Sequence, residues 1–200
     1  MGADRPAYGQ QLKLFFPSLS PGRADVETGT RQMQSVERLT RSAKETFEVA
    51  RQLGAELAGG EVLALVGDLG AGKTTFTRGL VCGTGCEEYM RVNSPTYVLE
   101  QVYQGRIPVR HYDAYRLDSP YELEDLGFQE ALSTEAVLVI EWADRVQSLL
   151  PADSLFLELS FASPDGAEEG PGNTRLLRFS SADGSWERRL AGLSRRADNE

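Results

Sequence analysis

Short apolar runs and alternating segments along the chain predict a central sheet. Residues 61–67 (EVLALVG) and 137–140 (VLVI) are almost wholly apolar. Runs of this kind are typical of strands that are buried on both faces of a parallel sheet. Residues 155–161 and 175–179 alternate between apolar and polar side chains, which predicts two further strands.

Another pair of strands has the pattern of a hairpin. Residues 96–103 and 107–112 have strand character, and Gly105 can turn the chain between them. Strands joined by a tight turn run antiparallel. We therefore expect a sheet that is partly parallel and partly antiparallel.

Helical periodicity appears on both sides of the strand predicted at 61–67. Apolar residues recur at three- and four-residue steps from 47 to 57, after Ser42 and Glu45, which can form a capping box. A second helix should begin near Lys73 and end by residues 83–85. Two further helices are predicted at 121–126 and 185–193. Together the elements predict an α/β fold with a mixed central sheet flanked by helices.

The ends of the chain differ in composition from the middle. Residues 1–35 mix glycine, proline, serine, arginine and glutamine around one short apolar cluster at 12–16. This predicts a disordered extension, with a docking peptide at the cluster as the alternative. A single domain is expected over 36–193, with an exposed acidic loop at 163–173 and a frayed tail at 194–200.

Composition and charge exclude several classes of protein. The 200 residues are 40% apolar, which is enough for one core, and the net charge of −9 argues against a broad cationic surface that could hold nucleic acid unaided. The chain lacks the roughly 20 consecutive apolar residues of a membrane span and the apolar core of a signal peptide, so a cytoplasmic protein is expected. His111 is the sole histidine, which excludes a multi-histidine metal site, and Cys82 and Cys86 have no second thiol pair for zinc.

The segment 67–74 (GDLGAGKT) matches the phosphate-loop motif G-x-x-x-x-G-K-[ST] at every position. It lies between a predicted buried strand and a predicted helix, where a loop backbone and a helix N-terminus can bind phosphate together. Lys73 would bridge the β- and γ-phosphates, Thr74 would offer its hydroxyl to Mg²⁺, and Thr75 would reach the α-phosphate. The alternative is a glycine-rich turn with a solvated lysine.

The predicted cofactors are ATP and Mg²⁺. The residues predicted to contact the nucleotide are Asp68, Leu69, Gly70, Ala71, Gly72, Lys73, Thr74 and Thr75.

Two carboxylates follow predicted strands and are candidates for the same site. Glu141 comes directly after the apolar run 137–140, where a phosphate-loop enzyme keeps the acid that holds the magnesium shell. Asp113 follows another strand and could position the attacking water or complete that shell, with a simple turn aspartate as the alternative. His111 alternates with Asp113 and is interpreted as a half-buried strand residue. Lys73, Asp113 and Glu141 are the expected catalytic residues.

The segment 93–97 (NSPTY) has two interpretations. It lies between the phosphate-loop helix and the next strand, where some phosphate-loop proteins sense the γ-phosphate through a threonine hydroxyl. Ser94-Pro95 is also a common turn signal, and from the residues alone a plain turn is favoured.

Four segments in this order resemble the motifs of the bacterial TsaE (YjeE) family. They are 67–79 (GDLGAGKTTFTRG), 93–99 (NSPTYVL), 111–117 (HYDAYRL) and 139–145 (VIEWADR), and the resemblance extends over roughly residues 40 to 180. Four ordered motifs are far more specific than a phosphate loop alone. Members of that family are ATPases required for the threonylcarbamoyladenosine modification of tRNA.

The resemblance implies a P-loop NTPase-like fold and slow, Mg²⁺-dependent ATP hydrolysis. It implies work with the TsaB–TsaD pair, which attaches the threonylcarbamoyl group to adenosine 37 of tRNAs reading ANN codons, so contact with tRNA would be indirect. The family's magnesium threonine falls on Thr74, its metal-binding glutamate on Glu141, and its catalytic aspartate on Asp113, which we also expect to support the metal. Adenosine contacts are implied near Ser42 and at Arg175, and the 94–96 loop is implied to be a switch.

Two other functions remain open from the sequence. A small-molecule kinase shares the phosphate loop, but it normally needs an acceptor pocket and an arginine-bearing lid, and no arginine-rich segment lies between the second and last predicted strands. A nucleotide-binding switch, whose hydrolysis only resets its grip on a partner, is compatible with the family resemblance.

Overall fold

The structure is a computed structural model, and it describes residues 34–96, 98–162, 172–182 and 184–195. Backbone contacts divide the chain into two units, Met1–Arg31 and Gln32–Glu200, and every described residue belongs to the second. The expected extension at 1–35 lies outside the described residues except for its last two positions. Most of the expected acidic loop at 163–173 also lies outside them.

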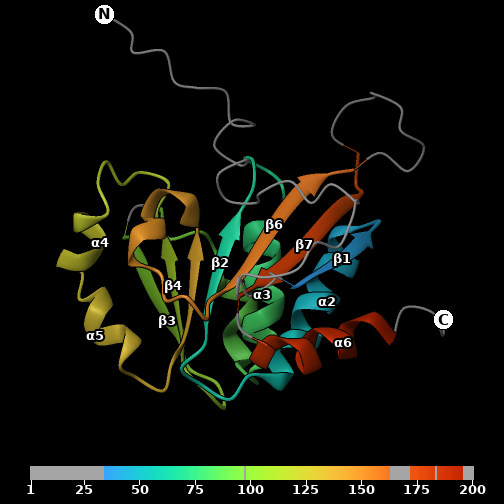
Figure 1. Ribbon diagram of the computed structural model, residues 1–200, viewed down its shortest axis with the longest axis horizontal. Coiled ribbons are helices and arrows are strands. Elements are labelled where there is room, and N and C mark those ends of the chain that lie inside the picture. Colours follow the sequence, from blue (N-terminus) through green and yellow to red (C-terminus); the bar gives the residue numbers. More distant parts are fainter. Residues whose placement is uncertain (1–33, 97, 163–171, 183, 196–200) are drawn as a thin grey trace, which may run out of the picture. The chain divides into compact units, whose positions relative to one another are not determined.

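Seven strands form one mixed sheet in the order β1-β7-β6-β2-β5-β4-β3 (Figure 1). The four strands β6, β2, β5 and β4 run parallel, whereas β1, β7 and β3 are antiparallel to their neighbours. The mixed sheet expected from the sequence is therefore confirmed. The strands are β1 (Gln34–Thr40), β2 (Val62–Val66), β3 (Glu100–Tyr103), β4 (Val109–Asp113), β5 (Val137–Glu141), β6 (Leu155–Phe161) and β7 (Arg175–Ser181).

Helices cover both faces of the sheet. On β4, Tyr112 packs edge-on against Phe128 of α5 with ring centroids 5.5 Å apart, while its neighbour His111 points to the other face, where α3 lies. Figure 1 shows α4 and α5 beside β3 and β4, with α2 and α6 grouped near β1 and β7. The helices are α2 (Ala43–Glu56), α3 (Lys73–Gly83), α4 (Tyr121–Asp125), α5 (Phe128–Leu132) and α6 (Glu187–Arg195), with 3-10 helices η1 (Glu87–Arg91), η2 (Ala143–Leu149) and η3 (Gly184–Trp186).

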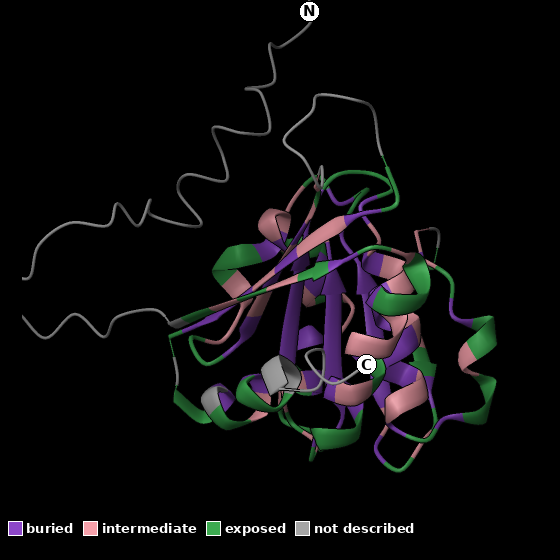
Figure 2. Cartoon of the chain, turned by 90° about the vertical axis from the view of Figure 1, so that its right-hand side faces the viewer, coloured by how far each residue is buried: buried purple, intermediate pink, exposed green. Residues whose placement is uncertain are grey.

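The two apolar runs of the sequence form the centre of the sheet. Every residue of β2 and β5 is buried, as Figure 2 shows for the central strands. This confirms that both strands are covered on both faces. Among the described residues, no helix combines the length and the apolar character that a membrane span requires.

The helix predicted after Ser42 is confirmed, together with its cap. Ser42 Oγ accepts a hydrogen bond of 3.1 Å from the Glu45 backbone N–H, and Glu45 Oε2 accepts one of 2.8 Å from the backbone N–H of Arg41. The glutamate thus reaches the residue before the cap rather than the cap itself. Both bonds satisfy backbone donors at the start of α2.

The largest differences from the strands expected from the sequence are at β3 and β1. β3 begins at Glu100 rather than at Thr96, because the Pro95 carbonyl accepts bonds from the N–H groups of Val98 and Leu99 and closes a turn there. Leu99 has a left-handed φ of 64°, which ends the turn just before the strand. In addition, β1 was not predicted at all. The expected end of the N-terminal extension, at residue 35, falls inside this strand.

Helices α2 and α3 cross with their backbones in direct contact, and glycines permit this approach. A Cβ atom at Gly79 would lie 2.2 Å from the Phe47 carbonyl oxygen and 2.8 Å from Ala50 Cβ. We expect Gly79→Ala to lower the free energy of unfolding by about 1–3 kcal/mol or more, because the helices must move apart. Chemical denaturation of the full chain measures this.

The matched control is Gly192→Ala on α6, where an added Cβ has no atom within 4 Å. Alanine has the higher helix propensity by up to about 1 kcal/mol, so this variant should be as stable as the wild type or more so. Equal stability of the Gly79 variant and the wild type would show that the helix pair is not tightly packed.

Candidate nucleotide-binding site

The phosphate loop connects the end of β2 to the start of α3, as the sequence predicts. Gly67, Gly70 and Gly72 have φ angles of 148°, 79° and 110°, which side-chain-bearing residues rarely adopt. A Cβ at Gly67 would also lie 2.3 Å from the Leu159 carbonyl oxygen of β6. The glycines of the motif are therefore required by the backbone itself.

The loop ends at the N-terminus of α3, which is built to receive an anion. Gly72 is the N-cap residue, so no side chain caps the helix. The N–H groups of the first turn, which belong to Lys73, Thr74 and Thr75, have no intrahelical acceptor. Together with the positive end of the helix dipole they form a site for phosphate oxygens.

The Lys73 side chain lies against the loop that it follows. Its Nζ donates to the carbonyl oxygens of Gly67 at 2.5 Å and Asp68 at 2.9 Å, and it lies 3.8 Å from the centre of the Trp142 ring. Burial lowers the pKa of Lys73, and the carboxylates of Glu141 and Asp113 oppose that shift. The ammonium group is thus stabilised by fixed acceptors rather than by water.

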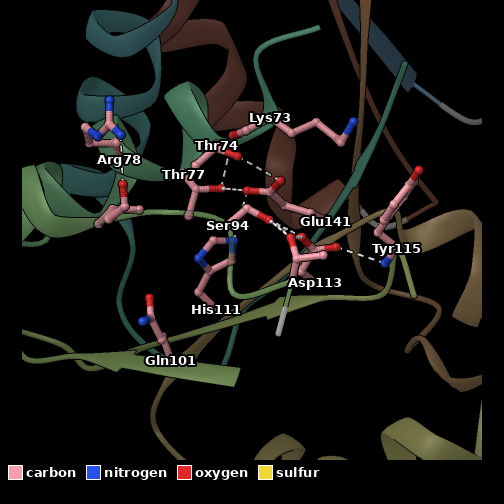
Figure 3. A network of polar contacts seen from close by, with 12 residues as sticks. Lys73, Thr74, Thr77, Arg78, Ser94, Gln101, His111, Asp113, Tyr115 and Glu141 are labelled. Atoms are coloured by element: carbon pink, nitrogen blue, oxygen red, sulfur yellow. Dashed lines mark hydrogen bonds and ion pairs between the residues drawn. The ribbon is translucent and has the colours of Figure 1, made fainter. Parts of the chain in front are cut away.

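Glu141, the last residue of β5, is at the centre of a buried polar network (Figure 3). Its carboxylate oxygen Oε2 accepts a bond of 3.0 Å from Thr74 Oγ1. Its other oxygen, Oε1, accepts bonds from His111 Nε2 at 2.9 Å and Thr77 Oγ1 at 3.3 Å. The acid predicted from the apolar run is therefore in contact with the threonine predicted from the phosphate-loop motif.

Asp113 ends the neighbouring strand β4 and is the register partner of Glu141. Its Oδ2 accepts bonds from the hydroxyls of Ser94 and Thr96, the latter at 2.8 Å, and its Oδ1 accepts a bond of 2.9 Å from the Tyr115 backbone N–H. The structure thus brings the two predicted acids to the same edge of the sheet. It also joins the 94–96 loop to Asp113, which a plain turn would not require.

The residues at this edge have the chemistry that magnesium prefers. No group of three or more His, Cys, Asp or Glu side chains that could hold a metal occurs in the described part of the chain. Magnesium, however, usually binds through one or two carboxylates together with water and substrate phosphate. The Thr74 hydroxyl and the carboxylates of Glu141 and Asp113 supply oxygen donors beside the phosphate loop, so they fit that ion.

Arg175 and Ser42 were expected to contact adenosine. Arg175 Nε donates to the Ala71 carbonyl oxygen at 3.1 Å, and its Nη2 donates to that of Gly70 at 3.3 Å. Burial lowers the pKa of Arg175. Because Thr40 of β1 is the register partner of Arg175, the start of α2 lies at the same end of the sheet as the phosphate loop. In this structure Ser42 caps α2 and Arg175 binds the loop backbone, and their contact with adenosine stays a prediction.

Sequence reasoning missed three residues of the network. Thr77 lies one helical turn after Thr74, and this spacing was the available signal that both face β5. His111 is wholly buried against Glu141 and not half-buried. Trp142 follows Glu141, has a left-handed φ of 58°, and packs against Lys73 and against the Tyr115 ring at 4.9 Å.

Comparisons with known proteins identify the family. Residues 40–168 match the model of the family described as threonylcarbamoyl adenosine biosynthesis protein TsaE. The chain is 40% identical over 131 residues to the tRNA threonylcarbamoyladenosine biosynthesis protein TsaE of Treponema pallidum, covering 66% of this chain and 95% of that protein. The corresponding protein of Bacillus subtilis is 38% identical over 137 residues, covering 68% and 84%.

A solved structure shows the same fold. The crystal structure of YdiB from Bacillus subtilis superimposes with a TM-score of 0.64 at 29% identity and covers 84% of this chain and 99% of that one. The P-loop NTPase-like α/β fold expected from the sequence is therefore confirmed. With a family model and relatives of this extent, the chain belongs to the TsaE family.

Proposed function

We propose that the protein is a Mg²⁺-dependent ATPase that supports the threonylcarbamoyladenosine modification at position 37 of tRNAs reading ANN codons. The observation that carries the proposal is the bond of 3.0 Å between the Thr74 hydroxyl and the Glu141 carboxylate beside the phosphate loop. This pairing of a loop threonine with a strand-end acid is the arrangement that phosphate-loop NTPases use around magnesium. The TsaE proteins that resemble the chain are named for the same modification.

The chain's own residues have distinct tasks in this proposal. The first-turn N–H groups of α3 and the Lys73 ammonium bind the phosphates. Thr74 and Glu141 hold magnesium, which when bound would neutralise charge on the transferring phosphate. Asp113 lies at the end of the strand next to Glu141 and orients the attacking water.

The proposal includes partners of the TsaB and TsaD type. Arg175, the arginine that contacts the loop, donates to the carbonyl oxygens of Gly70 and Ala71. It is thus engaged with the loop backbone rather than presented as an arginine finger, a device worth roughly 10³–10⁵ in rate where it is used. Hydrolysis by the chain alone should therefore be slow, and the net charge of −9 makes direct, tight binding of tRNA unfavourable.

Steady-state phosphate release tests the proposal. We expect slow release by the purified chain with ATP and Mg²⁺ and no acceptor, and faster release when purified TsaB and TsaD are added. A requirement for a small-molecule acceptor would instead indicate a kinase. An unchanged rate at saturating partner would contradict the proposed coupling, in which hydrolysis resets the grip on the partner, while leaving the nucleotide site intact.

A further inference from the structure

His111 is a buried polar side chain for which the proposed chemistry has no direct use. It lies on β4, it is the sole histidine of the chain, and its exposed fraction is 0%. Its Nε2 lies 2.9 Å from Glu141 Oε1 on the adjacent strand β5. The parallel register pairs His111 with Val139, two residues before Glu141, so both side chains are on the same face of the sheet.

The direction of this hydrogen bond follows from the chemistry of the two groups. An ionised carboxylate can only accept, so the proton must be on Nε2. The other ring nitrogen, Nδ1, has no hydrogen-bond partner among the described residues. A neutral imidazole with its hydrogen on Nε2 therefore satisfies Glu141 without leaving a second buried N–H unpaired.

The bond determines which way the carboxylate faces. Oε1 accepts from His111 at 2.9 Å, and Oε2 is directed to Thr74 at 3.0 Å. The Thr77 hydroxyl has one proton, which it shares between Oε1 at 3.3 Å and the Lys73 carbonyl oxygen at 3.1 Å. A carboxylate has a broad torsional preference about its last bond, so the side chain's own torsional energy does not fix its rotation. The bond from His111 to Oε1, together with the bond from Thr74 to Oε2, does fix it and keeps Oε2 at the predicted metal site.

We propose that His111 is a positioning residue that holds Glu141 with Oε2 toward Thr74 and thereby sets the affinity of the site for its divalent cation. The proposal rests on the proposed function, because it takes Glu141 as the metal-binding acid. An apolar residue would fill this core position without an unpaired ring nitrogen. The imidazole is therefore explained by what it does for Glu141 rather than by packing.

Three variants of the full chain test this inference. His111→Leu removes the donor, whereas His111→Gln retains an N–H donor at about the distance of Nε2. Tyr112→Phe is the matched control, because it removes a partly buried hydrogen bond of 2.9 Å to Glu100 from the adjacent position of β4 without touching Glu141. Mn²⁺ binding in the presence of ADP is measured by electron paramagnetic resonance, and ADP affinity is measured separately in EDTA.

We expect His111→Leu to weaken Mn²⁺ binding about 10- to 100-fold, as loss of such supporting contacts commonly does. ADP affinity in EDTA should change less than about twofold. His111→Gln should recover most of the Mn²⁺ affinity, and Tyr112→Phe should match the wild type. A merely structural role would not produce recovery by glutamine together with unchanged metal-free nucleotide binding.

Several results would overturn the inference. Wild-type Mn²⁺ affinity in His111→Leu would refute the inference and leave the proposed function intact. Equal losses of Mn²⁺ affinity in the leucine and glutamine variants would do the same, as would an equal loss in Tyr112→Phe. If His111→Leu does not fold, the glutamine variant decides, and weakened Mn²⁺ binding there counts against the inference. Absence of ADP-dependent Mn²⁺ binding in the wild type would overturn the proposed function and the inference with it.

Discussion

Replacing Lys73 with alanine should abolish productive ATP binding and turnover, with a loss of about 10²–10³-fold or more. The side chain is 5% exposed and its Nζ is bound by the carbonyl oxygens of Gly67 and Asp68, so the ammonium is already positioned at the loop. Without it, the β- and γ-phosphate charges would lose the cation that the loop motif itself supplies. Titration calorimetry with ATP and Mg²⁺ measures the binding, and phosphate release measures the turnover.

Arg51→Ala is the matched control for this change. It also removes one positive charge, but from the exposed face of α2, where Arg51 pairs with Glu48 at 2.6 Å. An exposed ion pair of this kind contributes little, so binding and turnover should stay at the wild-type level. Wild-type turnover in Lys73→Ala would refute the assignment of the phosphate loop itself.

Features that depend on neighbouring residues could be predicted from the sequence. The segment 67–74 combines a motif with a buried strand before it and a helix start after it, and all three are local signals. Glu141 was predicted because it directly follows a fully apolar run, where a phosphate-loop enzyme keeps the acid of the magnesium shell. Asp113 could be proposed for the same site because it also follows a predicted strand, and the register of β4 and β5 pairs the two residues.

Features that depend on register and distant partners could not be predicted. The contacts of Thr77 and His111 with Glu141 join three elements, and no local pattern specifies them. β1 is an edge strand whose pairing with β7 includes an ion pair of 2.8 Å between Glu37 and Arg178, far apart in the chain. Its charged sequence has weak strand character without that partner.

Asp113→Asn should separate catalysis from binding. We expect turnover to fall by about 10²–10⁴-fold, because asparagine cannot accept a proton from water or hold a negative charge beside it. ATP binding measured by calorimetry should change little, since Asp113 contacts neither the phosphate loop nor α3 through any described hydrogen bond. Asn can still accept from the Tyr115 N–H through its carbonyl oxygen.

The control is Asp118→Asn, which makes the same change of charge at an exposed position past the end of β4. That variant should keep wild-type turnover. Lys73→Ala is the second comparison, because Lys73 is proposed to bind the phosphates and Asp113 to orient the attacking water. If Asp113→Asn lost ATP affinity as severely as Lys73→Ala, Asp113 would belong to the binding machinery. Its bonds to Ser94 and Thr96 would then connect the 94–96 loop to nucleotide affinity rather than to the hydrolysis step.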